Sequence, residues 1–429
     1  MDFINELKWR GLIHQCSDEE RLVNRIGSGT ITAYIGFDPT APSLHVGSLL
    51  QVLTLQRLQR AGHRPIAIVG GATGLIGDPS GKSDERQLLT RERITINLAG
   101  IRKQLERFLD FSEGPTQPMV LDNSAWLDDV RLIDFLRDVG KHFSINEMTK
   151  RDSVRTRLEN RDQGISFTEF SYMLLQAYDF LVLYDRYNCI LQIGGSDQWG
   201  NALQGADLIR RLRGGTAFVL TAPLITTADG RKFGKTESSA IWLDAEQTSG
   251  YRFYQFWLNT DDRDVINYLK YFTFLPSEQI AELHECVRTH PEKREAQKIL
   301  AGEITRLVHG GSALLRAQKA TDVLFGRGTV SELSEKELLE AFQAVPFTRL
   351  DSSMIKSLQL RCIDLLVTSG IEPSKAQAAR DLAHGALSAN GSLLTSEDGP
   401  RIIDCKWLLH GQYVVFRRGK KDYALVHFT

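Results

Sequence analysis

The first half of the chain is dominated by short apolar runs separated by amphipathic stretches. Four runs rich in β-branched, aromatic and other apolar residues predict buried strands. These runs are residues 31–35, 66–69, 189–193 and 217–220. Between the first two runs, leucines recur at helical spacing from His45 until Gly62, a residue that can end a helix.

The alternation of strands with helices predicts the arrangement of the first half. Strands that are apolar throughout are typical of a parallel sheet covered by helices, so we expect an α/β fold. In such sheets the ligand binds outside the carboxyl ends of the strands. The loops that follow Ile35, Val69 and Ile193 are therefore expected to form the site.

The pattern changes in the second half. Helical periodicity dominates from about residue 249 to 325 and predicts a separate helical domain. Residues 330–352 resemble a linker with one short helix, which begins at the capping-box sequence from Ser334 to Glu337. The last segment, about 353–429, is small and mixed, and basic residues outnumber acidic ones in it.

Composition narrows the class of protein. A chain of 429 residues with 42% hydrophobic and 24% charged residues is typical of a globular protein of several domains. A net charge of −1 excludes a wholly basic nucleic-acid coat but allows a local basic patch. The excess of basic residues near the carboxyl end is consistent with a partner that has a phosphate backbone. The alternative is that these lysines and arginines lie on a solvated edge strand, where charges prevent pairing with other chains.

The absence of certain sequence features predicts the cellular location of the protein and the redox state of its cysteines. The longest uncharged small-apolar run, 65–77, is too short and too rich in glycine for a membrane span, and residues 1–6 do not start a secretory signal. The five cysteines are scattered singly, without a C-x-x-C pair. We expect reduced thiols, a cytoplasmic location, no membrane contact and no metal bound by the protein.

Residues 40–48 (Thr-Ala-Pro-Ser-Leu-His-Val-Gly-Ser) join the first strand to the first helix. A helix N-terminus presents free N–H groups and a positive dipole end, which favour phosphate binding. His45 adds a polar group there, and Gly47 leaves room for a nucleotide to lie on the helix. A plain helix cap by Ser43 or Ser48 is the alternative interpretation.

Residues 70–83 form a glycine-rich loop that is not a Walker A motif, because that motif requires a glycine at position 76, where Ile76 stands. The loop offers an acid at Asp78, and two cations, Lys82 and Arg86, lie in the loop and just after it. The acid suits an α-amino group and the cations suit a pyrophosphate. A structural turn is about equally consistent with the sequence.

Three further patterns carry polar groups. Residues 232–236 (Lys-Phe-Gly-Lys-Thr) place two lysines around a glycine, which suits a loop that closes on phosphates, although a solvated turn gives the same pattern. Residues 194–201 bring a second glycine-rich turn after a strand. Tyr172, Gln176 and Asp179 are spaced to share one face of a helix, where a buried aspartate requires a partner. A capped or exposed aspartate is the alternative interpretation.

Together these segments resemble a bacterial-type tyrosyl-tRNA synthetase, a class I aminoacyl-tRNA synthetase, over essentially the whole chain. Residues 45–48 match the first class I signature and residues 232–236 the second. Residues 34–40, 71–78 and 194–200 match the amino-acid pocket of that family. The last segment resembles an S4-like RNA-binding domain, notably in Ser374, Lys375, Arg380, Gly385, Asn390 and Gly391.

The resemblance implies a role for each candidate residue. The residues implied to act on the phosphates are Thr40, His45, Lys82, Arg86, Lys232, Lys235 and Thr236. Those implied to bind tyrosine are Tyr34, Gly36, Asp78, Tyr172, Gln176, Asp179 and Gln198. Those implied to bind ATP are His45, Gly47, Ser48, Gly195, Asp197 and Lys235. The candidates for tRNA are Arg210, Arg211, Arg417, Arg418, Lys420 and Lys421, with a solvated face as the alternative.

The resemblance also implies the architecture and the partners. A Rossmann-like catalytic domain (1–225) is expected to precede the second signature and a helical anticodon-binding domain (226–330). A linker (331–352) and the S4-like domain (353–429) follow. The implied reaction joins L-tyrosine to tRNA(Tyr) with ATP, whose Mg²⁺ arrives with the nucleotide, and the implied assembly is a homodimer.

One departure from the family pattern stands out. Ser48 replaces the second histidine or asparagine of the usual first signature. Because serine is shorter, we expect either a water that bridges it to the nucleotide or weaker ATP binding. Two other interpretations remain open at this stage. One is an RNA-binding paralogue without catalysis, such as an intron-splicing helper, and the other is a related adenylyltransferase or tryptophan enzyme.

Overall fold

The computed structural model describes most of the chain. The described residues are 2–80, 88–159, 164–230, 233–234, 240–325, 328–342, 345–356, 360–419 and 422–429. The chain divides into two compact units, the first made of 1–244 and 261–296 and the second of 245–260 and 297–429. The four-part division expected from the sequence stays a prediction.

Within the described residues, the first unit contains a six-stranded sheet in the order β1-β6-β5-β2-β3-β4. Its strands are β1 (Gln15–Cys16), β2 (Thr32–Phe37), β3 (Arg64–Val69), β4 (Met119–Asp122), β5 (Cys189–Gly195) and β6 (Phe218–Ala222). Every neighbouring pair is parallel except β1 with β6. The expected parallel-sheet α/β class is confirmed. The apolar pattern misses β1, which is two residues long, and β4, whose residues are all half-buried.

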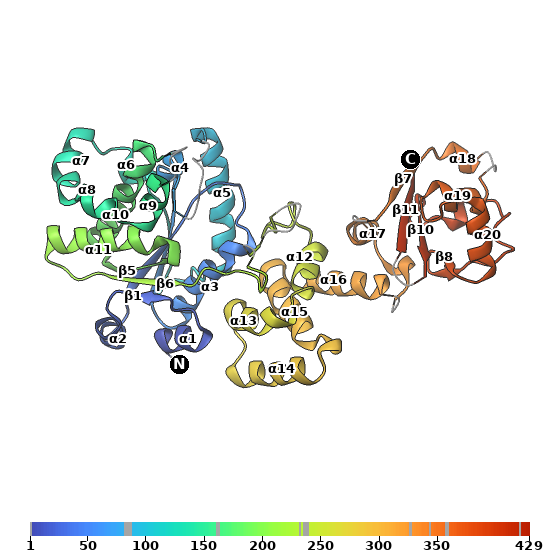
Figure 1. Cartoon of the computed structure of the whole chain (residues 1–429), viewed down its shortest axis with the longest axis horizontal. Helices are drawn as coiled ribbons and strands as arrows, with labels where there is room; N and C mark the ends of the chain where they lie inside the picture. The colour runs from blue at the N-terminus through green and yellow to red at the C-terminus, as the bar shows by residue number, and fades with distance from the viewer. Residues whose placement is uncertain are drawn as a thin grey trace. The chain divides into compact units, whose positions relative to one another are not determined.

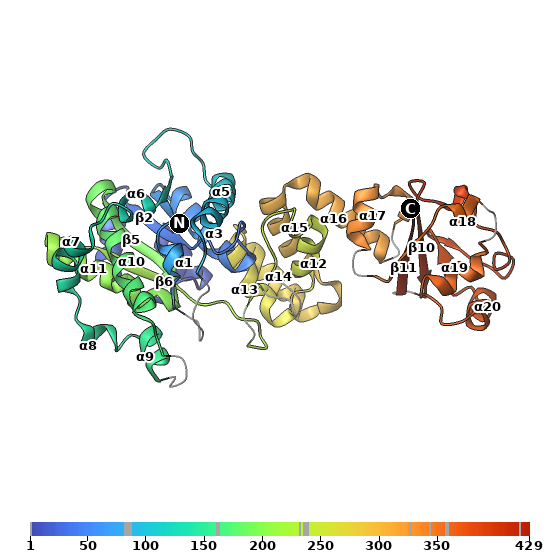
Figure 2. The ribbon, with the colours of Figure 1, turned by 90° about the horizontal axis from the view of Figure 1, so that it is seen from above.

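Helices cover both faces of this sheet. Figures 1 and 2 show α10 and α11 on one side and α3 and α5 on the other. The helices of the first unit are α1 (Phe3–Arg10), α2 (Glu19–Gly27), α3 (Val46–Arg60), α4 (Thr73–Ile76), α5 (Arg91–Phe108), α6 (Ser124–Leu127), α7 (Leu132–Asp138), η1 (Gly140–His142), α8 (Ile145–Met148), α9 (Asp152–Glu159), α10 (Phe167–Tyr187), η2 (Ser196–Gln198), α11 (Trp199–Arg213), α13 (Asp262–Phe272), α14 (Ser277–Thr289) and η3 (Pro291–Lys293).

The core on one face of the sheet is built by alternate strand residues. Tyr34 of β2 and Ile66 of β3 pack with Phe180 of α10 and Leu208 of α11, and all four are at most 2% exposed. Helix α10 begins at the cap Ser166, whose side chain accepts from the third amide of the helix. The position of this helix brings its polar stripe toward the carboxyl ends of the strands.

The second unit combines helices with a second sheet, in the order β7-β11-β10-β8-β9. Its elements are α12 (Gly250–Leu258), α15 (Glu295–His309, in this unit from residue 297), α16 (Gly311–Leu324), η4 (Val330–Glu332), α17 (Glu335–Ala341), β7 (Phe347–Leu350), α18 (Ser353–Lys356), α19 (Cys362–Thr368), α20 (Lys375–Ala383), β8 (Leu387–Ala389), β9 (Ser392–Leu393), η5 (Cys405–Trp407), β10 (Tyr413–Arg418) and β11 (Asp422–Phe428). The capping box predicted at Ser334 is present at the start of α17.

The two faces of the second sheet belong to different cores. Val414 and Phe416 of β10 pack in one core with α19 and α20, whereas Tyr413 and Val415 pack in another with α16 and α17. The segment expected as a linker contains β7, which pairs in parallel with β11. The sequence did not predict β7, because its four residues are exposed or half-buried and form no apolar run.

Two findings concern the chemistry of the chain as a whole. All five cysteines are free thiols, as their scattered positions predict. In the part of the chain that the structure describes, every helix is too short or too polar to cross a membrane.

Candidate active site

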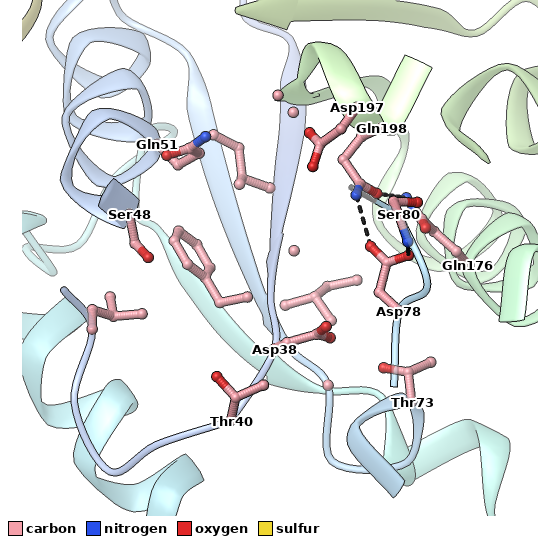
Figure 3. A pocket seen from close by; sticks show the side chains of 18 of the residues that line it. Asp38, Thr40, Ser48, Gln51, Thr73, Asp78, Ser80, Gln176, Asp197 and Gln198 are labelled. Carbon is pink, nitrogen blue, oxygen red and sulfur yellow. Dashed lines mark hydrogen bonds between the residues drawn. The ribbon is translucent and has the colours of Figure 1, made fainter. Parts of the chain in front are cut away.

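A cavity of about 450 Å³ lies at the carboxyl ends of β2, β3 and β5, where the sequence predicts the site. Its volume is in the usual range for a small-molecule site. The candidate residues that line it are Tyr34, Gly36, Thr40, His45, Gly47, Ser48, Asp78, Tyr172, Gln176, Asp179, Gly195, Asp197 and Gln198. Figure 3 shows Ser48 on one wall and Asp78, Gln176 and Gln198 on the opposite wall.

The first wall is the start of α3. His45 itself is the N-cap of this helix, because its Nδ1 accepts the Gly47 amide at 2.9 Å. The serine cap that the sequence also allowed is therefore not what begins the helix. A Cβ at Gly47 would lie 2.6 Å from the His45 ring, so glycine is required here for the ring to fold over the helix end.

Ser48 and Gln51 stand one turn apart on the face of α3 that lines the cavity (Figure 3). The Gln51 Oε1 is buried and has no hydrogen-bond partner among the described residues. A buried amide oxygen without a partner costs free energy unless a ligand satisfies it. Gln51 was not among the residues predicted from the sequence, although its spacing from Ser48 could have indicated it.

The closed end of the cavity holds Tyr34 and Asp179. The Asp179 carboxylate accepts hydrogen bonds from Trp126 Nε1 at 2.7 Å and Asn123 Nδ2 at 2.9 Å. The Tyr34 hydroxyl is buried and has no partner among the described residues. Burial raises the pKa of Asp179 to about 7, against the lowering effect of its two hydrogen-bond donors. Burial also raises the pKa of Tyr34, and the nearby Asp179 raises it further.

The polar stripe of α10 continues from this end toward the mouth. The Tyr172 hydroxyl donates to Asp38 Oδ1 at 3.1 Å, and burial followed by the nearby carboxylates raises the pKa of Tyr172. Gln176 bonds Gln198 through its amide at 3.2 Å. Tyr172, Gln176 and Asp179 therefore lie along one stripe, as their spacing predicts.

Asp78 is fixed by two donors. The Gln198 Nε2 donates to its Oδ2 at 2.7 Å, and the Ser80 amide donates to its Oδ1 at 2.9 Å. Asn201 closes the network, because its Nδ2 donates to Gln176 Oε1 at 3.1 Å and lies 3.3 Å from Ser80 Oγ. These bonds hold an acid at 7% exposure beside the stripe of α10 (Figure 3).

Five of the predicted phosphate-binding residues fall outside the described residues: Lys82, Arg86, Lys232, Lys235 and Thr236. Two residues of the second signature are described and reach the cavity. Phe233 and Gly234 line it together with His45 and Gly47 of the first signature. The two signatures, almost 190 positions apart in the sequence, thus meet at the start of α3.

Comparison with known proteins identifies the family. Residues 28–326 match tRNA synthetases class I (W and Y), and residues 337–426 match the tyrosine–tRNA ligase SYY-like C-terminal domain. The tyrosine–tRNA ligase of Bacillus caldotenax is 52% identical over 430 residues, which cover 100% of both chains. The chain belongs to the tyrosine–tRNA ligase family. Tyrosine–tRNA ligase 1 of Bacillus subtilis (strain 168) is similar at 51% identity, over 100% of this chain and 99% of its own.

Solved structures of this family share the fold. A C-terminally truncated mitochondrial tyrosyl-tRNA synthetase of Aspergillus nidulans superposes with a TM-score of 0.68 at 32% identity, over 76% of this chain and 94% of that one. The tyrosyl-tRNA synthetase of Archaeoglobus fulgidus, solved with L-tyrosine, has a TM-score of 0.54 at 18% identity, over 73% of this chain and 100% of that one. The second likeness concerns the fold alone.

Sequence reasoning missed several residues of the ligase cavity. Asn123 and Trp126, which hold Asp179, follow the unpredicted strand β4, so recognising that strand would have drawn attention to them. Asp38 and Asn201 lie inside two of the sequence motifs but were given no role. In the described ranges, no group of three or more His, Cys, Asp or Glu side chains is placed to hold a metal ion.

Among the described basic candidates for RNA, three of four form ion pairs. Arg210 and Arg211 both bind Asp207, at 2.5 and 2.6 Å. Arg418 lies 3.2 Å from Asp422 and 3.9 Å from Glu372. Arg417 and Arg418 are neighbours in β10, so their side chains point to opposite faces of the sheet. Lys420 and Lys421 lie outside the described residues.

Proposed function

We propose that this cavity activates L-tyrosine with ATP and then transfers the tyrosyl group to the 3′-terminal adenosine of tRNA(Tyr). In the first step a tyrosine carboxylate oxygen attacks the α-phosphorus of ATP, tyrosyl-adenylate forms and pyrophosphate leaves. In the second step a terminal ribose hydroxyl attacks the tyrosyl carbonyl and AMP leaves. Neither step requires an enzyme nucleophile, so positioning and charge stabilisation carry the catalysis.

The observation that carries the choice of tyrosine is the polar pair at the closed end of the cavity. A phenol placed there would donate its O–H to Asp179 and accept from the Tyr34 hydroxyl, which lacks a partner among the described residues. Phenylalanine would leave the buried Tyr34 hydroxyl without a partner, at about 1–3 kcal/mol, and would also lose the hydrogen bond to Asp179. Strong rejection of an analogue that lacks the hydroxyl is already known for tyrosyl-tRNA synthetases as a class, and the polar pair is consistent with it.

The stripe of α10 suits the other end of the amino acid. Tyr172 and Asp179 are seven residues apart, which corresponds to about 10 Å along a helix. An ammonium group has three N–H donors and needs three acceptors. We assign these to Asp78, the Tyr172 hydroxyl and the Gln176 carbonyl oxygen, with Gln198 and Gly36 completing the tyrosine site.

The start of α3 suits the nucleotide. The positive dipole end of this helix favours phosphate, and His45 and Thr40 line the same cavity. We assign the pyrophosphate to these residues together with Lys82, Arg86, Lys232, Lys235 and Thr236. The ribose and the α-phosphate are assigned to Gly47, Ser48, Gly195 and Asp197. Mg²⁺ is assigned to the incoming ATP and not to a protein site.

The remaining partners are also proposals. The tRNA would contact Arg210 and Arg211 of the first unit and Arg417, Arg418, Lys420 and Lys421 near the carboxyl end. The domains would follow the order given by the sequence, with 226–330 contributing to anticodon binding and 353–429 to binding of the tRNA body. We further propose a homodimer that works in the cytoplasm.

Tyrosine-dependent ATP–pyrophosphate exchange without tRNA tests the first step. Exchange is expected with tyrosine but not with phenylalanine or tryptophan, and Asp179→Ala is expected to lose that selectivity. Undiminished discrimination against phenylalanine in Asp179→Ala would refute the assigned phenol site. Folded protein that binds tRNA but supports exchange with no amino acid would favour an RNA-binding paralogue instead.

A further inference from the structure

One face of α13 holds the chain segment that leads into the second signature. Asp264, Tyr268 and Phe272 are spaced four residues apart, so they share this face, which is called the contact face of α13 below. The Asp264 Oδ2 accepts from the Ala228 amide at 2.9 Å. The Tyr268 hydroxyl donates to the Thr226 carbonyl at 3.3 Å. The helix thus binds the backbone just before the signature at two points.

The ring of Phe233 is the third point of attachment. It is 5% exposed and packs edge to face on Tyr268, with ring centroids 4.9 Å apart, and stacks on Phe272 at 5.3 Å. Such aromatic contacts have a preferred geometry and therefore restrict the orientation of the ring. In the sequence, Phe233 directly follows Lys232 and precedes Lys235 by two residues.

The same segment contacts the start of α3 on its other side. The Gly234 carbonyl accepts from the Ile241 amide at 3.2 Å, and the Ile241 carbonyl accepts from the Val46 amide at 2.9 Å. Gly234 has a φ of +84°, and a Cβ there would lie 2.9 Å from Val46 Cγ2. The segment therefore lies between α13 and the residues next to His45.

The carboxyl end of α13 is itself fixed. Arg10 donates to the Lys270 carbonyl at 2.9 Å, and Arg57 donates to the Tyr271 and Thr273 carbonyls at 2.9 and 3.0 Å. Both arginines are at most 4% exposed. Because Arg57 belongs to α3, the helix that starts at His45 also anchors the helix that holds Phe233.

We propose that the contact face of α13 positions the lysines of the second signature for the activation step. Asp264, Tyr268 and Phe272 are positioning residues, which act on the reaction through Phe233 and touch no substrate themselves. Fixing Phe233 sets the backbone of the signature against the start of α3, where the phosphates are proposed to bind. This inference rests on the proposed phosphate role of Lys232 and Lys235.

Steady-state ATP–pyrophosphate exchange with substitutions on the contact face tests the proposal. Tyr268→Leu and Phe272→Leu are expected to lower kcat on the order of 10- to 100-fold, because small displacements of catalytic groups have effects of that size. The KM for tyrosine should change less than about twofold, since the tyrosine site is left intact. Tyr268→Phe keeps the ring and should retain most of the rate. Asn267→Ala, on the exposed side of the same helix, is the control.

A double-mutant cycle with Lys235→Ala separates positioning from general damage. If the contact face acts through the signature, Phe272→Leu should lower kcat little further in the Lys235→Ala background. Fully additive losses, or a raised KM for tyrosine with kcat unchanged, would overturn the proposal. Asp264→Ala perturbs a half-buried side chain and should shift kcat in the same direction even if the leucine variants do not fold. An unchanged kcat in Lys235→Ala alone would instead refute the proposed role of the lysines.

Discussion

At the scale of single residues, the cavity depends on buried polar groups that are held by specific neighbours. Asp179 is buried at 5% exposure and keeps its orientation because Trp126 and Asn123 each donate to one of its oxygens. The nearby Tyr34 hydroxyl is buried and has no partner among the described residues, so a ligand could bond it. The chemistry at this end of the cavity is therefore a balance between the cost of burial and the bonds that a ligand supplies.

The raised pKa of Asp179 predicts a pH dependence. The ionised carboxylate accepts the phenol O–H best, and burial raises its pKa to about 7, so the favourable form is lost as the pH falls through that value. We expect kcat/KM for tyrosine to decline below about pH 7, because this parameter reports groups of the free enzyme. The measurement is the pH profile of pyrophosphate exchange.

Asp179→Asn is the matched variant for this experiment. Its amide has nearly the shape of the carboxylate but does not ionise, so its profile should lack the step assigned to Asp179. A step of the same size and midpoint in Asp179→Asn would assign the titration to another group.

Gln51 predicts a second residue-scale effect. Its buried Oε1 lacks a partner among the described residues and faces the cavity next to Ser48. If ATP satisfies this atom, Gln51→Ala should raise the KM for ATP about 5-fold, which corresponds to one hydrogen bond of about 1 kcal/mol. The measurement is the ATP dependence of pyrophosphate exchange.

Gln56→Ala provides the control. Gln56 is on the same helix, and its Oε1 is also buried without a described partner, but it does not line the cavity. Its substitution should leave the KM for ATP unchanged. If both substitutions raised the KM for ATP equally, the effect would come from the loss of any glutamine on α3, and Gln51 would have no specific role.

At the scale of elements, the strand β10 separates side chains that the sequence places together. Alternation along the strand puts Arg418 on the face packed against α19 and α20, and Arg417 on the face packed against α16 and α17. Arg418 is flanked by Glu372 and Asp422. The run of basic residues near the carboxyl end therefore does not form a single patch.

This arrangement predicts different contributions to tRNA binding. Arg417 has no hydrogen bond or ion pair with any residue that the structure describes, so its charge is available to a phosphate. Arg417→Ala should weaken tRNA binding and reduce the salt dependence by about one ion, whereas Arg418→Ala should do so less, because two acids already offset its charge. Filter binding over a series of salt concentrations compares the two. A larger loss in Arg418→Ala would contradict the assignment.

At the scale of the whole molecule, exposed apolar side chains predict an assembly. Leu132, Ile133 and Leu136 of α7 are 68%, 72% and 48% exposed, Ile145 of α8 is 59% exposed, and Phe167 at the start of α10 is 79% exposed. These residues lie within 36 positions of one another in the sequence, and exposed apolar side chains that form a patch are typical of an interaction site. A second copy of the chain is the occupant that the proposed homodimer supplies.

Substitution on this surface tests the dimer. Ile133→Asp combined with Leu136→Asp should convert a dimer of about twice 48.3 kDa into a monomer, because charges would be buried unpaired in the interface. Light scattering after size exclusion gives the mass. Leu315→Asp, a substitution of an exposed leucine of α16 in the other unit, should leave the dimer intact. A monomeric wild-type protein at micromolar concentration would refute the proposal.

Residues that are close together in the chain predict the class of fold and 13 of the residues that line the cavity. The strands β2, β3, β5 and β6 and the stripe on α10 follow from apolar runs and helical spacing, which are properties of residues close together in the chain. The family resemblance added the role of each motif. The residue spacing and the family motifs both lie within short segments, so they can be recognised without the folded structure.

Contacts between groups that are distant in the sequence are known only from the folded chain. Asn123 and Trp126 hold Asp179 across more than 50 positions, and α13 holds Phe233 from the far side of the second signature. Burial also determines which polar atoms lack partners and which carboxylates, Asp179 among them, have a raised pKa. These properties depend on the packing of segments that are remote in the sequence, and local periodicity carries no information about that packing.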